Sequence, residues 1–125
     1  EIHRDGANRL ILITTAAGWC TACIKEQPAL QELHDKYSNN GLFILVSIFE
    51  DGLFQAAQAA NAEQWKRQFK LSFEVVADPE FKLGAYYNRD QTPMVMLVDA
   101  CSMEILSLST GWDPDLVESI VESRL

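Results

Sequence analysis

Residues 10–23 read LILITTAAGWCTAC. The first six, Leu10–Thr15, form a β-branched apolar run with the continuous hydrophobicity of a strand that is buried on both faces. After a short link, two cysteines stand three residues apart at Cys20 and Cys23. We predict that a helix begins near Cys20, so the stretch places two thiols where a buried strand ends and a helix begins.

The rest of the chain alternates strand and helix signals. The first helix continues through the apolar stripe of Leu30, Leu33 and Tyr37, and Pro28 is expected to bend it. Further strands are predicted at Leu42–Phe49, Phe73–Ala77, Met94–Val98 and Glu104–Ser109. Further helical regions are predicted from Leu53 with an N-cap at Asn61, from Asp78 to near Asn88, and from Asp113 to the C-terminus.

This order, β-α-β-α-β-α-β-β-α, predicts an α/β fold with a mixed central sheet that is covered by helices on both faces. The strands Met94–Val98 and Glu104–Ser109 lie close enough in sequence to form a hairpin. No repeat or linker divides the chain, so we expect one domain over residues 1–125.

Composition excludes several classes of protein. The chain has 125 residues, 48% of them hydrophobic, which is enough to build a core without disulfide or metal staples. Ten Lys and Arg against 18 Asp and Glu give a net charge of −8, which disfavours nucleic acid. The longest apolar run, Leu42–Phe49, is too short to span a bilayer. The chain opens on Glu1 without a signal-like segment, so we expect a trimmed N-terminus.

The position of the two cysteines suggests their chemistry. Unpaired backbone N–H groups and the macrodipole at a helix N-terminus favour a thiolate, so we predict a depressed pKa for Cys20 and assign it as the attacking sulfur. Cys23 lies about one turn further on. It is close enough to close a disulfide with Cys20 and to resolve a mixed disulfide with a substrate.

Two sets of motifs carry a family resemblance. The pattern Cys-x-x-Cys-x-x-Glu-x-Pro-x-Leu is matched by Cys20, Cys23, Glu26, Pro28 and Leu30, after Trp19. A downstream pattern is matched by Asp78, Pro79, Tyr86, Thr92 and Pro93. In these motifs the chain resembles the thioredoxin fold, a three-layer sandwich, and within it the TlpA/ResA-like branch of thiol-disulfide oxidoreductases, which is grouped with the AhpC/TSA redoxins.

The resemblance implies roles for individual residues. Pro93 is similar to the family's cis-proline, which packs beside the dithiol and leaves the backbone of Thr92 free to pair with an extended substrate segment. Glu26 resembles the branch's active-site glutamate and would exchange a proton with Cys23, although a solvated carboxylate is an equal alternative. The Trp19 indole would shield part of the site.

The same resemblance implies a redox-active Cys20–Cys23 disulfide that needs no cofactor, because the dithiol is itself the redox group. Protein thiols or disulfides would be the substrates, with an upstream redox partner, and we expect a monomer. An extracytoplasmic, periplasmic bacterial setting is expected, while a cytoplasmic one stays open.

Three positions depart from the family pattern. Thr14 stands six residues before Cys20, where many thioredoxins have a buried Asp and the branch often has Asn, so we do not expect a proton relay from it. The Thr21-Ala22 dipeptide leaves open whether the protein reduces or oxidises its substrates. For Cys101 we expect a partly buried, inert thiol, with an accessory redox role or an intermolecular disulfide as the alternative.

Other functions fit the residues less well. A thiol peroxidase of the same fold is the alternative, but its signature Pro-x-x-x-Thr/Ser-x-x-Cys is absent, since Ala17 and Ile13 stand at those places before Cys20. A zinc site would need further ligands, and only His3 and His34 are present, in no paired pattern. We therefore predict no metal. A binding domain without catalysis is disfavoured because both cysteines and the Thr-Pro pair are present.

Overall fold

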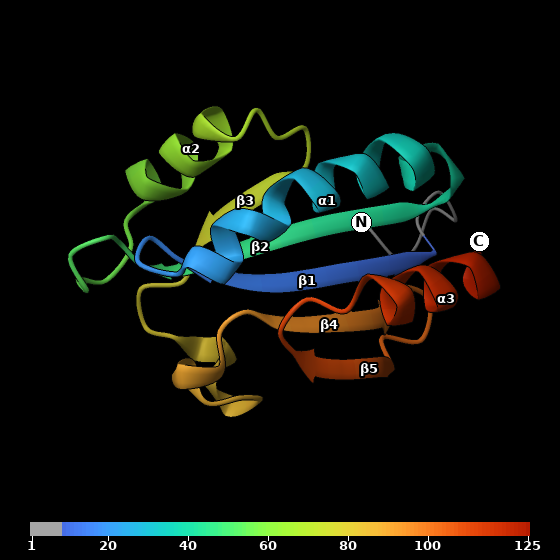
Figure 1. Cartoon of the computed structure of the whole chain (residues 1–125). Helices are drawn as coiled ribbons and strands as arrows, with labels where there is room; N and C mark the ends of the chain where they lie inside the picture. Colours follow the sequence, from blue (N-terminus) through green and yellow to red (C-terminus); the bar gives the residue numbers. More distant parts are fainter. Residues whose placement is uncertain (1–8) are drawn as a thin grey trace.

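The computed structural model describes residues 9–125, which contain a five-stranded sheet in the order β3-β2-β1-β4-β5 (Figure 1). Strands β1, β2 and β3 are parallel, whereas β4 and β5 are antiparallel to their neighbours, so the predicted mixed sheet and late hairpin are confirmed. The strands are β1 Leu10–Ala17, β2 Leu42–Glu50, β3 Glu74–Ala77, β4 Met94–Asp99 and β5 Ile105–Thr110. The α-helices are α1 Thr21–Tyr37, α2 Ala59–Gln68 and α3 Pro114–Arg124.

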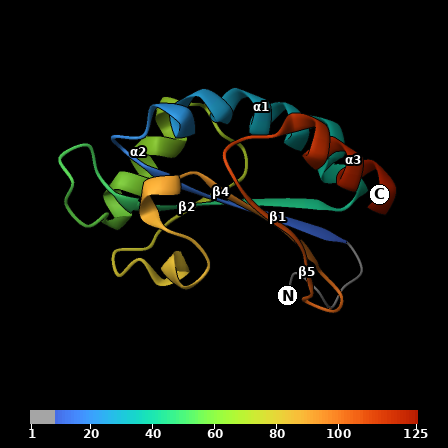
Figure 2. The same cartoon turned by 60° about the horizontal axis from the view of Figure 1, so that its bottom comes forward.

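Residues that alternate along the central strands contribute to two apolar clusters, one on each face of the sheet. The larger cluster joins Leu10, Leu12, Val95 and Leu97 of the sheet to buried residues of α1, α2 and α3. All three α-helices therefore pack on one face of the sheet, as Figure 2 shows, so the predicted helical cover of both faces is limited on the other face to short 3-10 helices. This arrangement brings the start of α1 directly to the end of β1.

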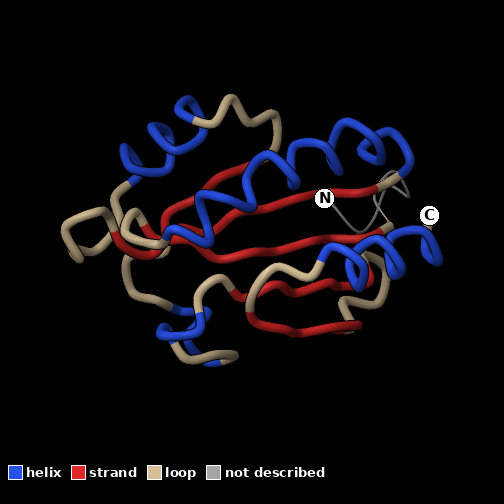
Figure 3. Tube along the Cα trace, viewed as in Figure 1, coloured by secondary structure: helices blue, strands red, loops and turns tan. Residues whose placement is uncertain are grey.

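The opposite face is covered by a different kind of structure. Its cluster contains Ile11, Met94 and Met96, against which Leu83 and Tyr87 pack. These two side chains come from the segment between β3 and β4, which carries the short 3-10 helices η2 Lys82–Ala85 and η3 Arg89–Gln91 (Figure 3). A third short 3-10 helix, η1 Ser38–Asn40, follows α1.

The α-helix predicted from Asp78 to near Asn88 is wrong. The Asp78 carboxylate does accept backbone N–H groups, from Lys82 at 2.9 Å and Leu83 at 3.2 Å. However, Phe81 adopts a left-handed φ of 52°, which interrupts helical propagation. Its ring packs 4.6 Å from the Phe49 ring, measured between centroids, and this tertiary contact accounts for the turn.

The helical region predicted from Leu53 is also wrong in part. The Asp51 carboxylate accepts the N–H groups of Leu53 and Gln55, and this holds the segment as a loop. Helix α2 begins after the N-cap Gln58, and Asn61 lies inside it as the partner in a capping box.

Helix α1 begins where it was predicted, with Cys20 as its N-cap, and continues through Pro28 to Tyr37. Pro28 has no N–H to donate to the carbonyl of Ile24. The bend expected at this proline stays a prediction. Among residues 9–125, no helix combines the length and the apolar character needed to cross a membrane.

Candidate active site around the Cys20–Cys23 disulfide

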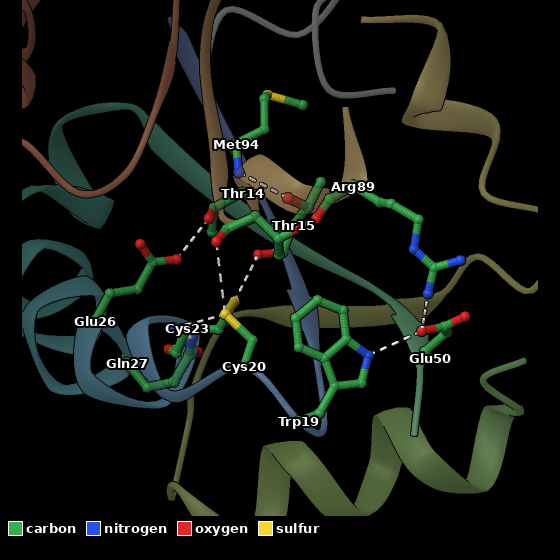
Figure 4. Close-up of a disulfide and its surroundings, with 11 residues drawn as sticks. Thr14, Thr15, Trp19, Cys20, Cys23, Glu26, Gln27, Glu50, Arg89 and Met94 are labelled. Carbon is green, nitrogen blue, oxygen red and sulfur yellow. Dashed lines mark hydrogen bonds and ion pairs between the residues drawn. A yellow bond between two sulfur atoms is a disulfide. The ribbon is translucent and has the colours of Figure 1, made fainter. Parts of the chain in front are cut away.

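The two cysteines of the first motif form a disulfide at the amino end of α1 (Figure 4). The Sγ of Cys20 accepts the backbone N–H of Cys23 at 3.1 Å and so caps the helix. Cys20 is 5% exposed, whereas Cys23 is fully buried. Any reagent that reaches this disulfide therefore meets Cys20 first.

The Thr92–Pro93 segment faces Cys20 from the other side. The Thr92–Pro93 peptide bond is cis, as the family resemblance implied. The carbonyl oxygen of Thr92 lies 3.8 Å from the Cys20 sulfur. The Thr92 N–H, in contrast, donates to the Arg89 carbonyl at 3.2 Å. The expectation that the backbone of Thr92 is free is therefore wrong for its N–H group, because η3 already uses it.

Thr15 joins the disulfide to the cis-proline segment, and the sequence analysis did not single it out. Its carbonyl oxygen lies 3.6 Å from the Cys23 sulfur. Its hydroxyl oxygen accepts the N–H of Met94, the residue after Pro93, at 2.8 Å. Gln27 was missed too; it is fully buried and donates to the Cys23 carbonyl at 2.8 Å. For Thr15 the available signal was a polar residue inside an apolar stretch, and for Gln27 it was the helical spacing from Cys23 and Leu30, which places it on the buried face.

Glu26 lies buried behind the disulfide and is only 2% exposed. Thr14 donates a hydrogen bond to one carboxyl oxygen at 2.5 Å, while the other oxygen has no partner among the described residues. Burial penalises the charged form and raises the pKa of Glu26 to about 8, although the Thr14 hydrogen bond acts in the opposite direction. The alternative of a solvated carboxylate is therefore wrong, and burial favours the neutral acid form of Glu26.

Trp19, directly before Cys20, is held on three sides. Its Nε1 donates to a Glu50 carboxyl oxygen at 2.8 Å. Its ring stacks on Phe54, with centroids 5.7 Å apart, and meets the edge of Phe49 at 6.1 Å. The backbone of Gly18 lies so close to the next loop that a Cβ there would stand 2.4 Å from the N of Gly52. The approach fixes the loop that carries the indole.

Cys101 and Tyr86, which the sequence analysis named, are both exposed. Cys101 is exposed in the β4–β5 turn, so the expectation of a partly buried thiol is wrong. The turn is held by the Asp99 carboxylate, which accepts the N–H groups of Cys101 and Ser102.

Tyr86, matched to the family motif, is half exposed, whereas Tyr87 packs inward and burial raises its pKa. His3 lies outside the described residues.

No group of three His, Cys, Asp or Glu side chains within residues 9–125 is placed to hold a metal ion. The arrangement offers the chemistry of the dithiol, with the Thr92 carbonyl facing the Cys20 sulfur and the buried carboxyl group of Glu26 one helical turn after Cys23.

A Cys-x-x-Cys disulfide at the start of a helix, facing a cis-proline at the end of a mixed sheet, defines a thioredoxin-like α/β fold. Known structures agree: a putative thiol:disulfide interchange protein DsbE from Chlorobium tepidum superposes with a TM-score of 0.72 at 20% identity, covering 94% of this chain and 79% of that one. A family model described as AhpC/TSA matches residues 3–104, and the chain belongs to this family.

Two further comparisons connect the chain to named proteins. It is 30% identical over 94 residues to the thiol-disulfide oxidoreductase ResA of Geobacillus kaustophilus, which covers 74% of this chain and 49% of ResA. The chain thus spans about half the length of this curated relative. The exposed lipoprotein thioredoxin of Streptococcus pneumoniae superposes with a TM-score of 0.69 at 18% identity, covering 95% of this chain and 87% of that one.

Proposed function

We propose that this protein is a thiol-disulfide oxidoreductase that exchanges its Cys20–Cys23 pair with partner proteins. The observation that carries the proposal is the placement of the disulfide: Cys20 caps α1 and is the accessible sulfur, while Cys23 is buried behind it. The AhpC/TSA membership and the similarity to ResA support the same activity.

In the reducing direction, the Cys20 thiolate attacks one sulfur of a substrate disulfide, and the other substrate sulfur leaves as a thiolate that takes up a proton. The N–H of Cys23 and the helix N-terminus stabilise the attacking thiolate. Cys23 then loses its proton and attacks the Cys20 sulfur of the mixed disulfide, which releases the second substrate thiol. Two electrons and two protons pass to the substrate, and the Cys20–Cys23 disulfide remains.

Thr92, Pro93 and Trp19 would align the substrate. The Thr92 carbonyl faces the Cys20 sulfur and can accept one backbone N–H from an extended segment that carries the reacting cysteine. Pro93 holds that carbonyl in place, and Trp19 forms the opposite side of the approach to Cys20. Since the Thr92 N–H is occupied, we expect one backbone hydrogen bond to the substrate from this residue instead of a pair.

The ionised form of Glu26, whose share grows as the pH approaches the pKa of about 8, would accept the proton of Cys23 during resolution, and the protonated form would return it in the reverse reaction. Glu26 comes one helical turn after Cys23, and the Thr14 hydroxyl that its carboxyl group contacts belongs to the residue directly before Thr15, whose carbonyl faces the Cys23 sulfur. Its pKa of about 8 lies near that of a thiol, which suits transfer in both directions.

The substrates that we propose are protein thiols and disulfides, and the proposed setting is extracytoplasmic and bacterial. The exposed lipoprotein among the similar structures supports the setting. We also propose a single domain over residues 1–125.

Reduction of insulin disulfides with dithiothreitol tests the activity. The parent chain is expected to accelerate insulin precipitation, and Cys20→Ser is expected to return the rate to that of dithiothreitol alone. Cys101→Ser is the matched control, because it removes an exposed thiol outside the site. Equal rates for the parent and Cys20→Ser would refute the proposal, and rapid hydrogen peroxide consumption would instead favour a peroxidase.

Measuring the reduction potential of the Cys20–Cys23 pair shows whether the protein reduces or oxidises its substrates. A value near about −270 mV would resemble thioredoxin and indicate a reductase, whereas a value near about −120 mV would resemble DsbA and indicate an oxidant. Equilibration with glutathione buffers of known ratio, followed by thiol alkylation and mass measurement, gives this value.

A further inference from the structure

Glu50, the last residue of β2, makes contacts that disulfide exchange by itself does not explain. One oxygen of its carboxylate accepts the indole N–H of Trp19 at 2.8 Å and also pairs with the guanidinium of Arg89 (Figure 4). The Glu50 side chain is only 13% exposed, compared with 46% for Arg89. These two partners hold the mostly buried carboxylate of Glu50 in place.

Arg89 continues the connection into the cis-proline segment. Its main-chain carbonyl accepts both the N–H of Thr92, at 3.2 Å, and the hydroxyl of Thr92, at 2.6 Å. Its guanidinium also lies over the ring of Phe49, 5.7 Å from the centroid. The side chain of Arg89 is thus fixed on β2, while its backbone fixes the residue whose carbonyl faces Cys20.

The backbone of Glu50 makes the matching connection on the other side of the disulfide. Its carbonyl accepts the N–H of Gly18 at 2.9 Å, and its side chain holds Trp19. Gly18 and Trp19 form the turn that leads into Cys20. Glu50 therefore contacts Gly18 and Trp19 directly and is linked to Thr92 through Arg89, so it is joined to both segments that flank the Cys20 sulfur.

We propose that Glu50 is a positioning residue which, through Trp19 and Arg89, sets the separation between the turn before Cys20 and the Thr92 carbonyl. A substrate polypeptide must enter between these two segments to reach the sulfur. The inference rests on the proposed function, since it concerns how the same site receives its substrate. Glu50 touches neither sulfur, so it acts on docking of the chain and leaves the exchange of sulfur atoms to the cysteines.

This role predicts a difference between large and small substrates. A protein disulfide must lay an extended segment along Thr92, whereas bis(2-hydroxyethyl) disulfide is neutral, carries no backbone and needs only the sulfur. Glu50→Gln keeps an oxygen for the Trp19 N–H but removes the charge that holds Arg89. Arg89→Gln removes the same ion pair from its more exposed side, so it tests the proposal even where Glu50→Gln does not fold.

The experiment measures KM and kcat for insulin reduction and, separately, the single-turnover rate of oxidation of the reduced protein by bis(2-hydroxyethyl) disulfide. Each variant is expected to raise KM for insulin about threefold to tenfold, with a smaller change in kcat and an unchanged rate with the small disulfide. The double variant is expected to be no worse than either single one, because both remove the same link.

Arg124→Gln is the matched control. It removes a similarly exposed ion pair, Arg124 to Asp99 at 3.1 Å, at the far end of the sheet, and should leave KM for insulin unchanged. The proposal is overturned if Glu50→Gln and Arg89→Gln keep the parent KM, or if both substrates slow in parallel. A parent chain that reduces neither substrate would instead refute the proposed function itself.

Discussion

The two ends of the sheet carry cysteines in opposite surroundings. Cys20 and Cys23 follow the carboxyl end of β1, while Cys101 lies in the β4–β5 turn, next to Asp99, which pairs with the first residue of β1. Strand β1 has eight residues, so the two ends are separated by roughly 25 Å. Cys101 cannot reach the other two sulfurs. Figure 1 shows the start of α1 and this turn at opposite ends.

The difference shows what prepares a thiol for exchange. Around Cys20 and Cys23 the fold gathers a helix N-terminus, the carbonyls of Thr15 and Thr92, and a buried carboxyl group. Cys101, in contrast, is exposed to solvent. The Asp99 carboxylate beside it accepts two backbone N–H groups that close the turn. These hydrogen bonds lower the pKa of Asp99. The surroundings of each cysteine, and not the residue type alone, therefore determine whether its thiol is prepared for exchange.

The largest effect is expected from removing the inner sulfur. Cys23→Ser should lower insulin reduction close to the rate of dithiothreitol alone, because the mixed disulfide on Cys20 can then be resolved only by external dithiothreitol. When the reduced variant is mixed with insulin without dithiothreitol, the trapped complex should appear on a non-reducing gel and vanish on reduction. If Cys23→Ser turned over like the parent chain, the resolving role would belong to another group.

The next effect concerns the pH dependence of stability at Glu26. Its pKa is raised in the folded state to about 8 from an ordinary 4.5, so the folded protein holds a proton that the unfolded chain releases. Stability from this group is fully present below the unfolded pKa and is lost as pH rises to about 8, by about 1.4 kcal/mol per pH unit at most.

Urea unfolding of the oxidised chain between about pH 5 and about pH 8 measures this loss. Glu26→Gln cannot ionise, so its free energy of unfolding should fall less over the same range than that of the parent. Parallel curves for the two proteins would show that Glu26 titrates normally.

A smaller effect is expected from Thr14→Val, which keeps the shape of the side chain but removes the hydrogen bond to Glu26. Because that bond favours the charged carboxylate, its loss should raise the pKa of Glu26 further. It should also cost about 1 kcal/mol of stability. Titration of the Glu26 carboxyl carbon by NMR measures the shift, and a lowered pKa would contradict it.

The smallest effect is expected at the other end of the sheet. Cys101→Ser should change the free energy of unfolding by less than about 0.5 kcal/mol, because the thiol is exposed and the turn is held by Asp99. In the oxidised parent chain, a maleimide should label Cys101 at once, and Cys20 and Cys23 only after reduction. Slow labelling of Cys101 would remove the contrast between the two ends.

Much of the fold could be predicted because it depends on local patterns. The continuous apolar runs of β1 and β2 and the Asp113-Pro114 start of α3 are confirmed near their predicted bounds. The segment from Asp78 to Asn88 was predicted wrongly because Phe81 leaves the helical region to pack on Phe49. A contact between residues so far apart in sequence has no local signal.

The sequence by itself determined the chemistry: two thiols at helical spacing, a carboxyl group one turn further on and a Thr-Pro pair. Those features follow from residue type and from spacing along one chain. Only the tertiary structure decided that Thr14 donates to Glu26, that Thr92 faces Cys20 with its carbonyl alone, and that Cys101 lies outside the site. Each of these depends on strand register and on how separate segments pack, which local sequence does not encode.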